Sequence, residues 1–361
     1  MDQFYRQNGG NAGRGQYALA ANAGRLIADT RKRLQELFHA SVKQVVFTPT
    51  ATIALNMILQ GIIKTNVRTV YITPFEHNAV TRTLHYFESR GSITVRNLIV
   101  SDKLEYDFER IRYQFDKEKP DLIVMSHASN VIGLIAPVKE ICCLAKNYGA
   151  VTVVDMAQTA GLIDLDLGLE VFDFAVFAGH KTLLGPTGLS GFLMKPDFQL
   201  PPVLFGGTGY DSANQNMPDS LPERYEMGTM NISGMAGLNA SLRWIKETTI
   251  EAIRAKEDEN RQKLLRILEK YNFITVVGNV LGRDYAGIVS CLIDGISSDS
   301  AGRILEERGI AVRTGLQCAP LAHQFLGTYP AGTIRFSVNY LTGENDFTEL
   351  KVALSDIEES I

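Results

Sequence analysis

Short apolar runs rich in β-branched and aromatic residues recur along the first half of the chain, separated mostly by stretches with helical spacing. The runs are QVVFT at 44–48, TVYIT at 69–73, ITVRNLIV at 93–100, DLIVMSHA at 121–128, AVTVVDMA at 150–157, FDFAVFAG at 172–179 and SGFLMK at 190–195. Helix-like stretches cover 51–61, 78–89 and 139–148. This alternation predicts an α/β fold with a mostly parallel sheet.

The pattern changes in the second half of the chain. A turn-rich passage at 205–229 precedes a stretch with helical spacing at about 235–271, and strand and helix patterns alternate again from about 287. Turn-rich passages commonly mark domain boundaries. We therefore expect three parts, which are an N-terminal arm at 1–20, a large domain at 21–235 and a smaller C-terminal α+β domain at 236–361.

Composition and charge restrict the class of partner. The 361 residues are 45% hydrophobic and 21% charged, with a net charge of -4, which is ordinary for a globular protein. The absence of a basic stripe argues against nucleic acid or an anionic membrane as the main partner and favours a small molecule. No apolar run reaches the roughly 18 residues of a spanning helix, and the start MDQFYRQNGGN lacks a secretory pattern, so we expect a cytoplasmic protein.

The four cysteines predict neither a disulfide framework nor a metal site. Cys142 and Cys143 are neighbours in a helix-like stretch, and Cys291 lies in the apolar run GIVSCLI, so we expect these three to be buried and unreactive. Cys318 lies in a loop-like context, RTGLQCAP, where a reactive thiolate is plausible.

Lys181 is the strongest candidate for chemistry. It follows the apolar run Phe174 to Phe177 in FAVFAGHKTLLGPTG, and lysine is rarely buried without a partner or a covalent role. Asp155 ends the strand AVTVVD, and alone it is read more readily as a helix cap. Together, a carboxylate and an amine at one sheet edge fit a pyridine cofactor, whose ring nitrogen needs an acid and whose aldehyde needs an amine.

Other polar residues also follow strands. His77 can stack on an aromatic ring and move protons, although a strand-end histidine is more often structural. Asn130 and Gln158 can bind the phenolic oxygen of such a ring, although asparagine also forms turns well. The threonine-rich helix start Thr50 to Thr52 suits a phosphate, or is simply a cap.

At this point the sequence resembles the class V aminotransferases among the fold-type I pyridoxal-phosphate enzymes, and within them the cysteine desulfurases with a short cysteine loop. The resemblance covers nearly the whole chain. The motifs, in family order, are GRGQYALA, FTPTATIALN, EHNAV, SHASNVIG, VVDMAQTAG, AGHKTLLGPTG, YEMGTMNISG, VRTGLQCAP and IRFSV. It implies a mostly parallel seven-stranded sheet in a large cofactor-binding domain, and a smaller C-terminal domain that carries the cysteine loop.

The resemblance implies a role for each matching residue. Lys181 would bind the cofactor aldehyde, Asp155 the ring nitrogen, and Gln158 with Asn130 the phenolic oxygen, while His77 would stack on the ring. The phosphate would be held by Ala51, Thr52, His180 and Thr229 of a second subunit, which requires a homodimer. Arg335 would hold the substrate carboxylate, with Asn130 as a second substrate-binding residue, although Arg335 alone reads as a surface arginine on an edge strand.

The resemblance also implies the reaction. L-Cysteine would become L-alanine, and its sulfur would remain as a persulfide on Cys318 for transfer to an acceptor protein, as in iron-sulfur cluster assembly. The alternatives are a selenocysteine lyase that uses L-selenocysteine, or another class V aminotransferase-type enzyme.

The chain departs from the family pattern at several positions. Ala178 stands where the family usually has a phosphate-binding serine, and Leu316 with Gln317 where close relatives have two histidines. Ala178, and a start downstream of the family's first strand, also leave open a non-catalytic cofactor-binding scaffold dimer. The presence of both Lys181 and Asp155 argues against that reading.

Overall fold

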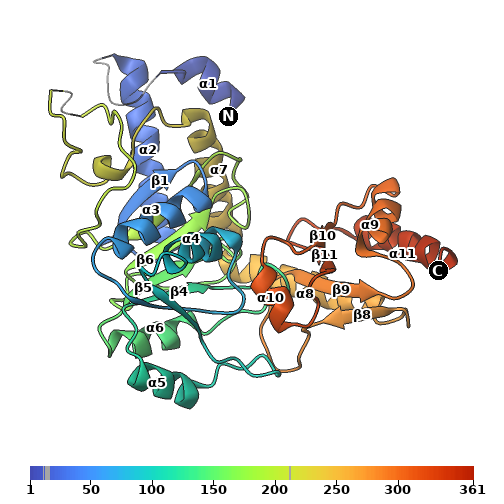
Figure 1. The fold of residues 1–361 in the computed structure, drawn as a ribbon. Helices are drawn as coiled ribbons and strands as arrows, with labels where there is room; N and C mark the ends of the chain where they lie inside the picture. Colours follow the sequence, from blue (N-terminus) through green and yellow to red (C-terminus); the bar gives the residue numbers. More distant parts are fainter. Residues whose placement is uncertain (11, 13–16, 211–212) are drawn as a thin grey trace.

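A seven-stranded sheet forms the centre of the larger part of the molecule (Figure 1). The computed structural model describes residues 1–10, 12, 17–210 and 213–361. The strand order is β1-β7-β6-β5-β4-β2-β3, and only β7 runs antiparallel to its neighbours. The strands are β1 (Gln44–Thr48), β2 (Thr69–Ile72), β3 (Thr94–Asn97), β4 (Leu122–Ser126), β5 (Val151–Asp155), β6 (Phe174–Ala178) and β7 (Ser190–Met194). The predicted α/β fold with a mostly parallel sheet is confirmed.

Helices cover both faces of this sheet, which explains why its central strands are mostly apolar and do not alternate between apolar and polar residues. One face packs against α3 (Ala51–Ile63) and α4 (Asn78–Glu88). The other packs against α2 (Ala18–Leu37), α5 (Phe108–Lys117), α6 (Val138–Lys146) and α7 (Ile232–Thr248). None of the helices in the described part of the chain is long and apolar enough to cross a bilayer.

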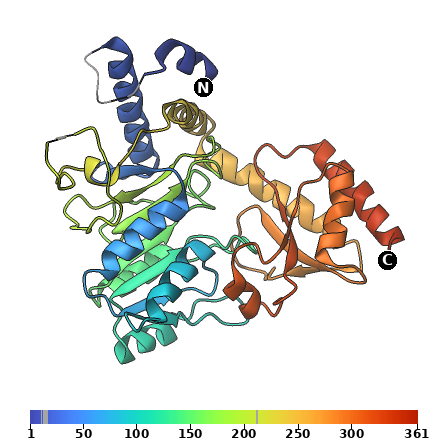
Figure 2. The same ribbon diagram turned by 45° about the horizontal axis from the view of Figure 1, so that its top comes forward.

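A second, four-stranded antiparallel sheet lies beside the first (Figure 2). Its order is β10-β11-β9-β8, with β8 (Ile274–Val277), β9 (Ile288–Ile293), β10 (Arg313–Gly315) and β11 (Thr333–Ser337). Its own apolar core includes residues of α8 (Ile250–Leu268), α9 (Ser298–Glu307) and α11 (Glu344–Glu359). The remaining elements are α1 (Asp2–Asn8), the short 3-10 helix η1 (Glu223–Tyr225) and α10 (Pro320–Phe325).

The helical stretch expected at 235–271 is two helices rather than one. Thr249 ends α7 and begins α8 with a φ of 71°, a conformation that a β-branched residue adopts at a cost. Its side chain accepts a hydrogen bond from the Ala252 N–H, which caps α8. Leu238 and Leu242 of α7 pack in the core of the large sheet, so the expected boundary at 235/236 falls inside a helix of that core. The division into domains stays a prediction.

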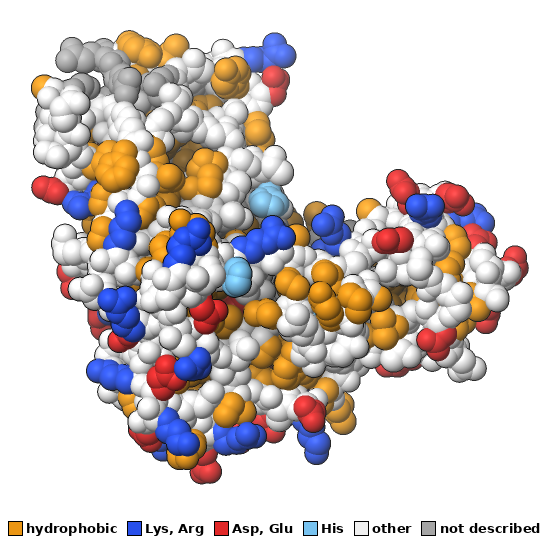
Figure 3. Space-filling model, viewed as in Figure 1, with side chains coloured by type: hydrophobic (Ala, Val, Ile, Leu, Met, Phe, Trp, Pro, Cys, Tyr) orange, Lys and Arg blue, Asp and Glu red, His pale blue; other side chains and the backbone are white. Residues whose placement is uncertain are grey.

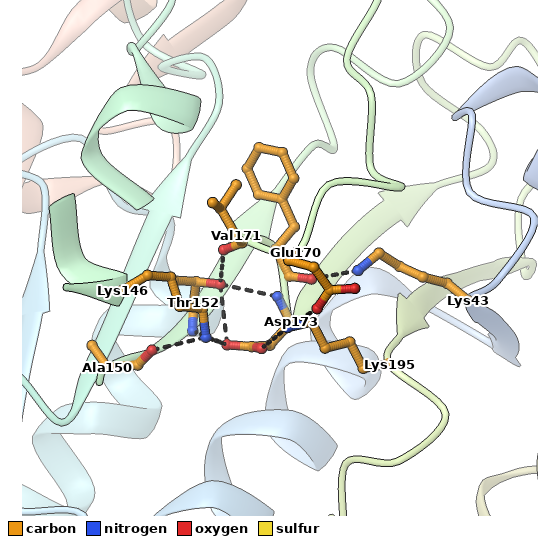
Figure 4. Close-up of polar contacts among 9 residues, drawn as sticks. Lys43, Lys146, Ala150, Thr152, Glu170, Val171, Asp173 and Lys195 are labelled. Carbon is orange, nitrogen blue, oxygen red and sulfur yellow. Dashed lines mark hydrogen bonds and ion pairs between the residues drawn. The ribbon is translucent and has the colours of Figure 1, made fainter. Parts of the chain in front are cut away.

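A group of charged side chains connects several strands of the seven-stranded sheet (Figure 4). It lies at the edge where the parallel strands begin, opposite the edge where they end. Asp173 is buried just before β6, accepts from the Thr152 N–H at 2.8 Å, and forms ion pairs with Lys146 and Lys195. Lys43, just before β1, donates from its buried amine to the Phe172 carbonyl. These contacts fix the relative positions of strands that carry site residues at their other ends.

Candidate active site

Polar side chains from four neighbouring strands and one helix start meet around a cavity of about 270 Å³. They follow the carboxyl ends of β2, β4, β5 and β6, which share one edge because these strands are parallel. Of the residues expected in the site, the cavity is lined by Ala51, Thr52, His77, Asn130, Asp155, Gln158, His180 and Lys181. Figure 3 shows the surface hollowed where the larger part of the molecule meets the smaller one.

Lys181 lies three residues after the end of β6 and is partly buried. Burial lowers the pKa of its amine below the usual lysine value, and nearby Arg335 lowers it further. The negative charge of Asp155 opposes this shift. The amine is therefore neutral at a lower pH than a free lysine, and a neutral amine is the form that attacks a carbonyl and accepts a proton.

Asp155 is the last residue of β5 and is almost fully buried. Its Oδ1 accepts from the Ala157 N–H at 2.9 Å, which fixes the carboxylate against the cavity wall. This acid suits the ring nitrogen of a pyridine cofactor, because a carboxylate favours the protonated ring.

Glu76 is a buried acid that the sequence reasoning did not single out. It accepts from the Ser126 N–H at 2.9 Å and from the Thr73 hydroxyl at 2.6 Å. Burial, and the charge of Asp155, raise the pKa of this carboxyl to about 7. The feature of the sequence that could have pointed to Glu76 is its position directly before His77.

His77 caps the N-terminus of α4. Its Nδ1 accepts from the Ala79 N–H at 3.0 Å, so the proton of the neutral ring lies on Nε2. Burial lowers the pKa of the ring, which favours that neutral form. A neutral imidazole that lines the cavity suits stacking against an aromatic ring.

The start of α3 supplies donors for an anion. The Thr50 side chain accepts from the Ile53 N–H at 3.2 Å. The N–H groups of Ala51 and Thr52 lie in the first turn of the helix, where the helix itself provides no acceptor for them. His180 lines the cavity as well, and Ala178 presents only a methyl group there. Backbone donors at a positive helix end suit a phosphate group.

Cys318 lies in the loop after β10 and is exposed. It borders a groove of about 610 Å³ that also contains His77 and Thr52, both of which line the first cavity. The Cys318 carbonyl accepts from the Asn78 N–H at 2.7 Å, so the loop is attached beside His77. The cysteine therefore lies at the mouth of the cavity that contains Lys181.

Arg335 lies on β11 with Ile334 and Phe336 turned into the core, as the alternation predicts. It is partly buried, and its Nη1 donates to the Asn130 carbonyl at 2.8 Å. Its Nε is buried and has no partner among the described residues. A partly buried arginine with a free donor suits a substrate carboxylate.

The position of Thr229 leaves its expected role open, and the exposure of Cys143 corrects an expectation. Thr229 is exposed and does not line the cavity of its own chain, so its role across a dimer interface stays a prediction. The expectation that Cys143 is buried is wrong, because it is exposed while its neighbour Cys142 is buried. Successive residues of a helix point about 100° apart, so one of two neighbours can face the core while the other faces outward.

The donor set around the cavity fits pyridoxal phosphate. It has an amine at one side, a fixed carboxylate at another, and a helix start with free N–H groups. The Oδ1 of Asn130 is buried without a partner among the described residues, which leaves an amide available to a polar ligand. No group of acidic, cysteine and histidine side chains in the described residues has the arrangement of a metal site.

Comparisons with known proteins agree with this geometry. The family model for aminotransferase class V matches residues 1–350. A probable cysteine desulfurase from Methanothermobacter thermautotrophicus is 30% identical over 99% of this chain and 90% of the relative, and one from Halalkalibacterium halodurans is 29% identical over 99% and 89%.

The solved apo structure of the cysteine desulfurase from Thermococcus onnurineus superimposes with a TM-score of 0.90 at 26% identity, covering 100% of this chain and 90% of that one. It confirms the expected fold, that of fold-type I pyridoxal-phosphate enzymes. The chain belongs to the class V aminotransferase family.

Proposed function

We propose that the chain is a pyridoxal-phosphate-dependent cysteine desulfurase that converts L-cysteine to L-alanine and keeps the sulfur as a persulfide on Cys318. The observation that carries the proposal is the position of this exposed thiol, on a loop attached beside His77 at the mouth of the cavity that contains Lys181. The cysteine desulfurases among its relatives support the same reaction.

The cofactor would be held by side chains from several strands. Asp155 would contact the ring nitrogen, His77 would stack on the ring, and Asn130 with Gln158 would bind its phenolic oxygen. The phosphate would be bound by Ala51, Thr52, His180 and the Thr229 of a second subunit. When bound, the cofactor supplies an electron sink that weakens the bonds at the substrate's Cα and Cβ.

Substrate binding and proton transfer would be carried out by side chains of the chain itself. Arg335 would bind the carboxylate of L-cysteine and orient its Cα toward the amine of Lys181. Because burial lowers the pKa of this amine, it is available in the neutral form that accepts the Cα proton. The same amine, once protonated, can return a proton to carbon.

The sulfur step is a displacement at the sulfur of the substrate. The Cys318 thiolate attacks that sulfur, an S–S bond forms, and the Cβ–S bond breaks with its electron pair going to the carbon skeleton. Protonation at carbon completes L-alanine. Cysteine plus an enzyme thiol thus yields alanine plus an enzyme persulfide without any external oxidant or reductant.

The wider setting is part of the same proposal. A homodimer would complete the phosphate site through Thr229, and a sulfur-acceptor protein would take the persulfide sulfur, for instance in iron-sulfur cluster assembly. A cytoplasmic location for these events is part of the same proposal.

The test measures alanine and sulfide from L-cysteine in the presence of a thiol reductant. Cys318→Ala is expected to abolish sulfide release while retaining the yellow cofactor, and Cys143→Ala, which removes the other exposed thiol, is the matched control. Borohydride reduction followed by peptide mapping is expected to find the cofactor on Lys181.

Three results would contradict the proposal. Cofactor attached to a residue other than Lys181 would remove the covalent role of that lysine. Unchanged sulfide release in Cys318→Ala, with L-selenocysteine strongly preferred in competition, would favour a selenocysteine lyase. A protein that stays colourless after addition of pyridoxal phosphate would favour a scaffold.

A further inference from the structure

We propose that Gln317 is a positioning residue that holds the Cys318 thiol in place for the sulfur step, an inference that rests on the proposed desulfurase function. The residue precedes the cysteine in a short loop between β10 and α10. Its side chain is almost fully buried, in contrast to the exposed Cys318 beside it.

The backbone of this loop needs external support. Gln317 and Cys318 have φ values of 41° and 60°, and two consecutive residues other than glycine rarely adopt the left-handed region. Such a conformation persists only where surrounding contacts hold it. The side chain of Gln317 supplies several of these contacts.

The amide of Gln317 joins three segments of the smaller part of the molecule. Its Nε2 donates to the Thr333 carbonyl at 2.9 Å and to the Arg313 carbonyl at 3.2 Å, at the starts of β11 and β10. Its Oε1 lies 2.7 Å from Nε2 of His323 on α10. One buried side chain thus connects two strands and a helix around the cysteine loop.

The partners fix the direction of each hydrogen bond. Since Nε2 of Gln317 faces two carbonyls, its Oε1 must be the acceptor, and His323 therefore donates from its Nε2. The Nδ1 of a neutral His323 then accepts from the Thr328 hydroxyl at 2.7 Å. Thr328, His323 and Gln317 form a chain of hydrogen bonds in which each member is satisfied.

The loop is also attached to the larger part of the molecule. Asn130 Nδ2 donates to the Gln317 carbonyl at 2.6 Å, and the Asn78 N–H donates to the Cys318 carbonyl at 2.7 Å. Asn130 lines the cavity of Lys181, and Asn78 follows His77. Both bonds form only when the carbonyls of Gln317 and Cys318 face the larger part of the molecule, and the hydrogen bonds of the Gln317 side chain hold the loop in that conformation.

This arrangement separates positioning from substrate binding. Loss of the Gln317 hydrogen bonds would release the loop and move the thiol away from the substrate sulfur, while Arg335 would still hold the substrate carboxylate. A displacement of about 1 Å in a reacting group can cost on the order of 100-fold in rate. The structure therefore assigns the effect of Gln317 to kcat and not to KM.

The test compares Gln317→Met, which preserves the length of the side chain and removes its hydrogen bonds, with Leu316→Met, which places the same side chain one residue earlier. We expect Gln317→Met to lower kcat for alanine formation on the order of 10-fold or more, with KM within about two-fold of wild type. Hydrogen exchange at the Asn78 amide, measured with and without cofactor, is expected to accelerate in the same variant. Leu316→Met is expected to change neither quantity.

Thr328→Val provides a milder variant for the case in which Gln317→Met does not fold. It removes the hydroxyl at the far end of the hydrogen-bond chain, and we expect an intermediate fall in kcat with faster Asn78 exchange. Wild-type kcat and wild-type exchange in either folded variant would overturn the proposal, as would a lower kcat without faster exchange. If the wild-type protein forms no alanine, the proposed function fails, and the Asn78 exchange still decides whether Gln317 holds the loop.

Discussion

Asn130 donates from its Nδ2 to the Gln317 carbonyl at 2.6 Å, so a residue of the cofactor cavity is bonded directly to the cysteine loop. The Asn130 backbone carbonyl in turn accepts from Arg335 at 2.8 Å. One asparagine therefore contacts the loop that carries the thiol and the arginine expected to bind substrate. An amide nitrogen has two hydrogens, so Nδ2 can serve the loop and the phenolic oxygen of a cofactor together.

Asn130→Asp tests this double role with almost no change in shape. The carboxylate cannot donate to the Gln317 carbonyl or to a phenolic oxygen, and we expect weaker cofactor binding and a kcat reduced on the order of 10-fold. The measurements are a cofactor titration by absorbance and steady-state alanine formation. Normal values for both would show that the Asn130 amide has neither role.

Arg335→Lys tests the proposed site for the substrate carboxylate. Lysine keeps the charge and loses the planar pair of donors, so we expect KM for L-cysteine to rise on the order of 10-fold or more. Arg313 lies directly opposite Arg335 on the neighbouring strand and is exposed, so Arg313→Lys is the matched control. A similar KM in the two variants would count against the assignment.

Ala178→Ser tests the proposed phosphate site. Ala178 lines the cavity at the end of β6, where a serine would add a hydroxyl donor. A hydrogen bond to a charged group contributes about 1.5–3 kcal/mol, so we expect cofactor binding to tighten on the order of 10-fold. The dissociation constant of the cofactor gives the answer, and an unchanged value would place the phosphate elsewhere.

The buried Lys43 leads to a prediction about pH. Burial, and the positive charge of Lys195, lower the pKa of the Lys43 amine from 10.5 to about 8, and Asp173 opposes this shift (Figure 4). Between about 8 and about 10.5 the unfolded lysine holds more protons than the folded one, so the contribution of Lys43 to the free energy of unfolding rises with pH.

The comparison is therefore between wild type and Lys43→Met in denaturant titrations across this range. We expect the difference in unfolding free energy to move in favour of wild type as pH rises, whereas Lys64→Met, at an exposed lysine, is expected to show no such trend. A constant difference would mean that folding leaves the Lys43 pKa unchanged.

Much of the fold could be predicted from the sequence because its signals are local. The runs around Val124, Val153 and Val176 are mostly apolar without a strict alternation, and the structure buries both faces of these strands. The break at Thr249 was missed because the residues on both sides of it continue a helical pattern. Only the packing of α7 in one core and of the later turns of α8 in another makes the bend necessary.

The site was predictable to the extent that its residues follow strands. Lys181, Asp155, His77 and Asn130 could be placed at one edge because parallel strands bring their carboxyl ends together. The contact between Asn78 and Cys318 joins distant segments of the chain, and nothing in the local pattern of either segment indicates it. The hydrogen-bond network of Gln317 was missed for the same reason.

Arg335 lies on the four-stranded sheet and Cys318 lies in the loop that follows β10 of that sheet, whereas Lys181 lies in the loop that follows β6 of the seven-stranded sheet. The thiol and the guanidinium therefore lie in the smaller part of the molecule, and the amine lies in the larger part. Any change in the angle between the two sheets preserves the spacing from thiol to guanidinium and alters the distance of both from the amine. A change in the angle between the two sheets would thus affect proton transfer at the substrate carbon and attack by the thiol on the substrate sulfur to different extents, without any substitution inside the cavity.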